Sequence, residues 1–111
     1  MGIKTLNMEA QKEIQKIKNQ IVKNYKPEKI ILFGSFAYGK PNKNSDLDLL
    51  IIKNTKSSRV KRIKDVLMKV DSDLPLEPLV YTPKELACRI KLGGDFFIEE
   101  VIRKGKIIYE K

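Results

Sequence analysis

The sequence has no histidine and no tryptophan, and Cys88 is its single cysteine. Without histidine there is no Ser-His-Asp or Cys-His nucleophile, no histidine general base and no histidine-ligated zinc. Any metal site therefore has to use oxygen ligands, which favour Mg²⁺, Mn²⁺ or Ca²⁺. A lone cysteine cannot close an internal disulfide, so we expect the reducing environment of the cytoplasm.

Long apolar runs are also missing. The longest, Leu47–Ile52, is interrupted by Asp48 and is far shorter than the roughly 20 residues of a membrane span. The first residues lack the apolar run and the small-residue cleavage site of a secretory signal. We therefore expect neither a membrane association nor a secretory leader.

Acidic residues are scarce relative to basic ones: 14 Asp and Glu against 23 Lys and Arg, for a formal net charge of +9. Such a balance attracts nucleotide phosphates, nucleic acid and acidic proteins. Most of the lysines are scattered, which is typical of a solubilising surface. A denser group opens a predicted helix with Arg59, Lys61, Arg62 and Lys64, where cations oppose the helix dipole. An acidic or nucleic-acid partner and a plain solvated face both stay open for this group.

The chain has 111 residues, of which 41% are hydrophobic. We expect a single domain over residues 1–111, since the chain can bury one core and has little left for a second. Strands alternating with helices predict an α/β (α+β) fold with one sheet. Pro78 lies within the third strand and predicts an edge position or a bulge, because proline has no N–H for the ladder. The expected strands are Lys29–Phe33, Asp46–Ile52, Leu76–Tyr81 and the short Lys106–Tyr109.

Apolar residues at spacings of three and four predict two helices. The first runs over about residues 6–24, with its stripe starting at Leu6 and ending before Pro27. The second has Ser57 or Ser58 as its N-cap. Its expected inward face is Val60, Ile63, Leu67 and Val70.

Two further helices follow from capping signals. The segment Thr82–Glu85 has the pattern of a capping box with proline at the first helical position, and this helix is expected to end near Gly93 and Gly94. Asp95 is expected to cap a last helix, which Gly105 terminates.

Two aspartates stand at the start of the second strand. Side chains alternate across a strand, so Asp46 and Asp48 face one side, about 7 Å apart, while Leu47 and Leu49 anchor the strand in the core. Two carboxylates this close are unfavourable without a cation. Mg²⁺ prefers one or two carboxylates together with waters and substrate phosphates, so the pair predicts a metal site.

Gly34 and Ser35 lie between a strand end and a short helical segment. Glycine allows a tight turn and the close approach of a ligand, and Ser35 offers a hydroxyl and a backbone N–H. Either feature alone is compatible with a plain turn. Gly-Ser followed after ten residues by Asp-x-Asp is expected by chance in about one or two chains per thousand. The combination predicts phosphate binding beside the metal.

This pattern resembles the nucleotidyltransferase domain of the DNA polymerase β superfamily, and within it the minimal nucleotidyltransferases often encoded beside a HEPN-domain protein. The match lies in Gly34, Ser35, the ten-residue spacer and Asp46-Leu47-Asp48. Leu76–Leu86 also resembles the family's third-strand region, with Glu77 at its third carboxylate. The resemblance covers roughly Lys29 to Leu86 and implies a small mixed sheet of about three to four strands packed with helices.

The resemblance implies that ATP phosphates bind at Gly34 and Ser35, and that Asp46 and Asp48 hold two Mg²⁺ ions, with Mn²⁺ as an alternative. Glu77 then ligates the second ion or takes the proton from the hydroxyl that attacks the α-phosphate. Family members paired with HEPN toxins resemble antitoxins that transfer AMP to a tyrosine of the toxin. We therefore expect a Mg²⁺-dependent, AMP-transferring antitoxin with a HEPN-domain toxin as its partner.

Two other functions stay open from the sequence. One is a catalytically weak antitoxin subunit that neutralises its partner by binding alone, and the other is a basic nucleic-acid-binding module. The chain departs from the family pattern at Tyr38, where many relatives carry arginine, and at Glu77, where aspartate is common.

Overall fold

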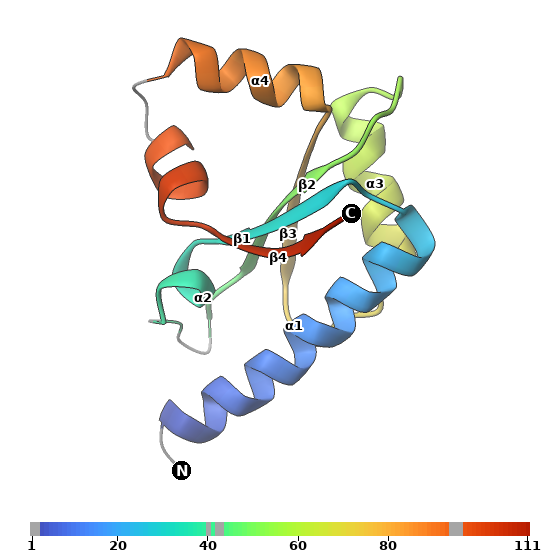
Figure 1. Ribbon diagram of the computed structural model, residues 1–111. Helices are drawn as coiled ribbons and strands as arrows, with labels where there is room; N and C mark the ends of the chain where they lie inside the picture. Colours follow the sequence, from blue (N-terminus) through green and yellow to red (C-terminus); the bar gives the residue numbers. More distant parts are fainter. Residues whose placement is uncertain (1–2, 40, 42–43, 94–96) are drawn as a thin grey trace.

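The structure is a computed structural model that describes residues 3–39, 41, 44–93 and 97–111. One sheet forms its centre, and the helices lie around it (Figure 1). In chain order the elements are α1 (Ile3–Tyr25), β1 (Lys29–Phe33), α2 (Ser35–Tyr38), β2 (Leu47–Ile52), α3 (Arg59–Lys69), β3 (Leu76–Tyr81), α4 (Pro83–Leu92), the π-helix η1 (Ile98–Arg103) and β4 (Lys106–Glu110).

The sheet has four strands in the order β3-β2-β1-β4 and is mixed. β1 pairs antiparallel with β2 and with β4. β2 and β3 are parallel, and the crossover helix α3 connects them. The expected α/β fold with one small mixed sheet is therefore confirmed. β3 is an edge strand, as Pro78 predicts, and it pairs with β2 without a register shift.

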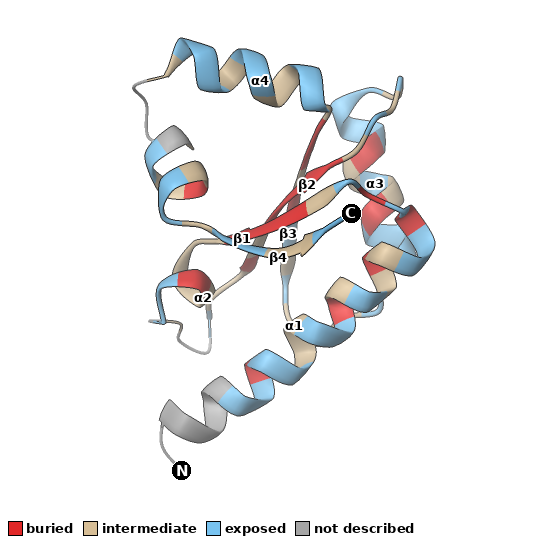
Figure 2. Ribbon diagram, in the orientation of Figure 1, coloured by how far each residue is buried: buried red, intermediate tan, exposed pale blue. Residues whose placement is uncertain are grey.

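The core lies on both faces of the sheet. On one face α1 and α3 pack against the strands, and Figure 2 shows their inward sides as buried. On the other face Val101 of η1 is buried against β1, β2 and β3. In β2, Leu47 and Leu49 are fully buried, as predicted, and Asp48 is the one residue of that strand that is not buried. Asp48 is thus a polar position in an otherwise apolar strand.

The predicted inward face of α3 is wrong in part. Val60 and Leu67 are 70% and 44% exposed, whereas Ile63 is half-buried and Val70 packs against the core. Val66 and Arg62 are buried in place of the two exposed residues, and the Arg62 guanidinium has hydrogen-bond partners inside the fold. Ser58 is the N-cap, since its side chain accepts a hydrogen bond from the Lys61 N–H.

Arg62 joins three elements from inside the fold. Its Nε donates to the Ser57 carbonyl at 2.8 Å, and one of its terminal nitrogens, Nη1, donates to the Val80 carbonyl at 3.1 Å and to Glu85 Oε1 at 2.7 Å. Glu85 also completes the predicted capping box with Thr82, with Pro83 at the first turn of α4. The start of α3, the end of β3 and the start of α4 are held together by this one side chain.

The remaining expectations are met in part. α1 covers the helix expected over residues 6–24, and α4 ends at Gly93 as predicted. The last helix is the π-helix η1, followed by Gly105. The proposed Asp95 cap, Gly94 and the side chain of Leu6 lie outside what the structure describes. Cys88 is a free, exposed thiol. Among the described helices, none is both long and apolar enough to cross a bilayer.

The buried role of Arg62 can be tested by truncation. Arg62→Ala should lower the free energy of unfolding by about 3 kcal/mol, because the buried Val80 carbonyl, the partly buried Ser57 carbonyl and Glu85 lose their donor. The matched control is Lys61→Ala, which breaks only an exposed pair with Asp65 and should change stability by less than about 1 kcal/mol. Urea unfolding measures both variants, and equal losses would contradict the buried network.

The same pair predicts a pH dependence of stability. The pKa of Glu85 is lowered, first by its hydrogen bond with Arg62 and then by the Thr82 backbone. Because the pKa of Glu85 is lower in the folded state than in the unfolded chain, the ionised carboxylate stabilises the fold at pH values above the unfolded pKa of about 4.3. This stabilisation is lost as the pH falls through the folded-state pKa. In urea titrations at a series of acidic pH values, the wild type should therefore lose stability more steeply than Glu85→Gln. Parallel curves would exclude the effect.

Candidate active site

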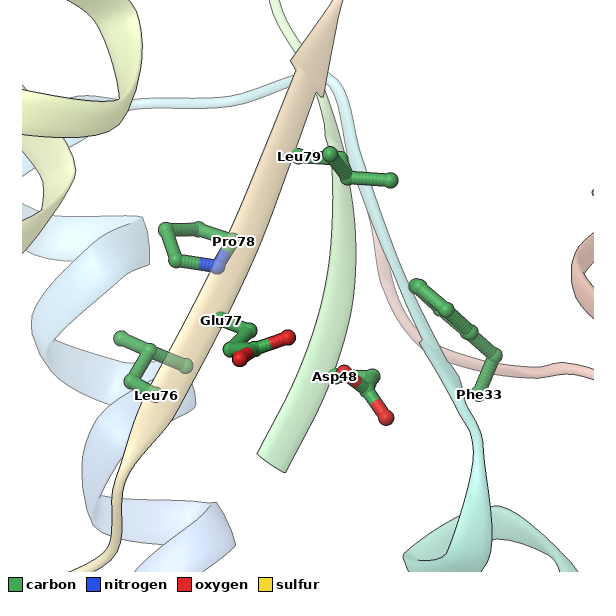
Figure 3. Close-up of a pocket in the computed structure, with 6 residues that line it drawn as sticks. All are labelled: Phe33, Asp48, Leu76, Glu77, Pro78 and Leu79. Atoms are coloured by element: carbon green, nitrogen blue, oxygen red, sulfur yellow. The ribbon is translucent and has the colours of Figure 1, made fainter. Parts of the chain in front are cut away.

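Two carboxylates face each other across the parallel pair β2 and β3. Asp48 lies directly opposite Glu77 in the strand register. Figure 3 shows both side chains on the same side of the sheet, in a pocket of about 410 Å³. The pocket walls are largely apolar and come from Phe33, Leu76, Pro78 and Leu79. A carboxylate pair thus stands in an open pocket with apolar walls.

Asp46 joins this pair from just before β2, which begins at Leu47, one residue later than expected. The pKa of Glu77 is raised, first by side-chain hydrogen bonding with Asp46 and then by the Asp46 charge. The pKa of Asp48 is raised to about 6, first by burial and then by the charges of Glu77 and Asp46. The structure therefore brings together the three carboxylates that the sequence singled out.

The Gly-Ser turn lies against the same carboxylates. Gly34 follows β1, whose last residue, Phe33, lies opposite Asp48. A Cβ on Gly34 would stand 2.2 Å from Asp48 Oδ2, and Gly34 has a φ of 78° and a ψ of −161° that glycine alone adopts readily. The backbone of Gly34 is thus packed directly on the Asp48 carboxylate, with Ser35 next to it at the start of α2.

The donor chemistry of this site fits a divalent cation. Oxygen ligands from three acidic residues suit Mg²⁺ or Mn²⁺, and a bound cation would offset both the burial and the neighbouring charges that raise the pKa of Asp48. Within the described ranges, no group of three or more acidic residues is already arranged around a common point as metal ligands are. Metal ligation by Asp46, Asp48 and Glu77 stays a prediction.

A contact next to the turn was not foreseen from the sequence. The Tyr38 hydroxyl, at the end of α2, donates to the carbonyl of Glu100 at 2.8 Å and to its carboxylate Oε2 at 2.5 Å. Glu100 belongs to η1, 62 residues further along the chain. No local pattern signals such a pair, because its two members become neighbours only when η1 packs on β1.

The comparison with known families agrees with this geometry. The profile of the family "Polymerase beta, Nucleotidyltransferase" matches residues 15–111. The chain belongs to this nucleotidyltransferase family. The resemblance stated from Gly34, Ser35, Asp46 and Asp48 is thereby confirmed at the level of the family. No curated protein sequence matches the chain.

Two solved structures share the fold of this nucleotidyltransferase. A toxin–antitoxin structure with AMP-PNP aligns with a TM-score of 0.57 and 21% identity over 87% of this chain and 73% of that one. A putative nucleotidyltransferase from Sulfolobus solfataricus aligns with a TM-score of 0.59 and 15% identity over 92% of this chain and 86% of that one. At these identities the similarity shows a common fold.

Replacing Gly34 tests whether its close approach to Asp48 is required. Gly34→Ala should lower the free energy of unfolding by about 3 kcal/mol, since it adds an overlap with Asp48 to an unfavourable backbone conformation. Gly39→Ala is the matched control: Gly39 has a φ of 76°, but a Cβ there meets nothing within 4 Å, so only about 1 kcal/mol is expected. Thermal and urea unfolding measure both, and equal losses would contradict the contact.

Proposed function

We propose that this nucleotidyltransferase transfers AMP from ATP to a hydroxyl of a partner protein and thereby acts as an antitoxin. The expected partner is a HEPN-domain toxin, with a tyrosine as the acceptor. One observation carries the assignment of the site: the Gly34 backbone lies against Asp48, and Asp48 lies opposite Glu77. A phosphate-binding turn and a set of metal-binding carboxylates thus adjoin each other, as nucleotidyl transfer requires.

Each part of the site has a task in this reaction. Gly34 and Ser35 bind the triphosphate through backbone N–H groups and the Ser35 hydroxyl. Asp46, Asp48 and Glu77 would hold the divalent ions, which when bound neutralise charge on the attacking and leaving oxygens. Alternatively, Glu77 accepts the proton of the attacking hydroxyl. The acceptor oxygen bonds to the α-phosphorus, the bond to the bridging oxygen breaks, and pyrophosphate leaves.

An aromatic acceptor suits the pocket beside Glu77. Its walls are Phe33, Leu76, Pro78 and Leu79, so an apolar ring is buried while its hydroxyl reaches the carboxylates. β3 is an edge strand, which leaves this side of the site accessible to another protein. The structural similarity to a toxin–antitoxin structure with AMP-PNP supports both the partner and the nucleotide.

Transfer of label from ATP carrying a labelled α-phosphate tests the proposed function. The chain is mixed with Mg²⁺ and the product of the neighbouring gene, and label on that protein is measured. Asp48→Asn should reduce transfer by at least about hundredfold, because it removes a metal ligand while leaving the strand intact. Asp65→Asn is the control, since this half-buried carboxylate belongs to α3 and pairs with Lys61.

The outcomes separate two functions. Label that is lost in Asp48→Asn and in chelator, and kept in Asp65→Asn, supports metal-dependent AMP transfer. A stable, neutralised complex that takes up no label with the wild type would overturn transfer in favour of an antitoxin that acts by binding alone. Full transfer by Asp48→Asn would show that the site has been assigned to the wrong residues.

A further inference from the structure

Tyr38 ends the short helix α2, which begins directly after Gly34, where a nucleotide phosphate is expected. Its hydroxyl donates to the carbonyl and to the carboxylate of Glu100. Burial and Glu100 are the main causes that raise the pKa of Tyr38, and the Gly34 backbone and the Asp48 charge act on this pKa as well, so both lie near the hydroxyl. One phenol oxygen therefore connects η1 with the turn that is expected to bind phosphate.

This arrangement places a fourth negative charge beside the site. The Glu100 carboxylate accepts a hydrogen bond from Tyr38 at the end of α2, and its other oxygen pairs with Lys104 at 3.2 Å. Its pKa is lowered, first by the hydrogen bond from Tyr38 and then by the one from Lys104, so it is ionised at neutral pH. A carboxylate held beside the turn repels a triphosphate, and the Tyr38 hydroxyl competes with a phosphate oxygen for the polar groups of the turn.

The hydrogen bond between Tyr38 and Glu100 is charge-assisted, and the Tyr38 side chain is exposed enough for this bond to break. A neutral hydroxyl donating to a carboxylate forms a charge-assisted hydrogen bond, and burial together with Glu100 raises the pKa of Tyr38 to about 12. The Tyr38 side chain is nevertheless 37% exposed, and α2 is a single turn of four residues between two glycines. Tyr38 can therefore swing away without disturbing the core, in which Ala37 of the same turn is buried.

We propose that Tyr38 and Glu100 form a latch that keeps anions out of the Gly34 turn. A nucleotide phosphate then binds only after the Tyr38 hydroxyl has left Gly34 and Glu100, and this release frees η1 from α2. The latch rests on the proposed function, because it regulates nucleotide entry into the same site. It also gives a partner protein that contacts η1 a route to control that entry.

The latch predicts tighter nucleotide binding when it is removed. Tyr38→Phe deletes the hydroxyl and keeps the ring, and Glu100→Gln keeps a hydrogen-bond acceptor but deletes the charge. Each variant should bind ATP with Mg²⁺ about fivefold more tightly than the wild type in calorimetric titrations. Glu99→Gln is the matched control: it removes the same charge from η1, but Glu99 pairs with Arg103 and not with Tyr38, so the affinity should stay unchanged.

Hydrogen exchange supplies a second measurement. A contact with a purely structural role would not change the exchange rates when nucleotide is added. In the wild type, adding ATP with Mg²⁺ should accelerate amide exchange in residues 98–105, because the latch opens, although ligands ordinarily slow exchange. In Tyr38→Phe these amides should exchange rapidly from the start and should not respond to the nucleotide.

The results distinguish the latch from the function on which it rests. If neither the wild type nor any variant binds ATP, the proposed function is overturned, and the latch with it. If the wild type binds ATP but Tyr38→Phe and Glu100→Gln bind equally or more weakly, the latch alone is overturned and Tyr38 is a support of the turn. If Glu99→Gln binds ATP more tightly to the same degree, the gain in affinity comes from removing any negative charge on η1, and the latch is also overturned.

Discussion

The approach of the Gly34 backbone to the Asp48 carboxylate is the constraint on which the site depends. It follows from the antiparallel pairing of β1 and β2, which sets Phe33 opposite Asp48. The turn after β1 then has no room for a side chain at its first position. Because β2 is buried along both faces except at Asp48, the strand cannot slip by one residue without placing this carboxylate in the core. The apolar residues of β2 therefore fix the position of the Asp48 carboxylate.

The opposite end of the same strands is held in a different way. Arg62 there binds the Ser57 and Val80 carbonyls and Glu85, and so joins the crossover helix α3 to the end of β3 and to α4. The crossover determines where β3 lies, and the position of β3 determines that Glu77 faces Asp48. A buried arginine at one end of the sheet thus contributes to the spacing of carboxylates at the other.

Several features were predictable because they are local. The alternation of Leu47, Asp48 and Leu49, the capping box at Thr82 and the edge position signalled by Pro78 each depend on a few adjacent residues. The burial of Arg62 in α3 was not predictable, since a sequence pattern treats arginine as a surface residue and two of its partners, Val80 and Glu85, come from other elements. The contact between Tyr38 and Glu100 was also not predictable from the sequence, because β2, α3, β3 and α4 lie between the two residues in the chain. The expectation that Glu77 lies beside the two aspartates came from the family resemblance. The register of β2 and β3, which sets Glu77 opposite Asp48, explains this position.

The crowding of the three carboxylates lowers the stability of the folded state. Burial and the neighbouring charges both raise the pKa of Asp48, so the folded state holds its charged form less favourably than the unfolded chain does. An apolar residue at this position would extend the buried surface of β2 and remove the repulsion. An unpaired Asp48 thus costs the sheet stability, and a bound cation at this position would offset that cost.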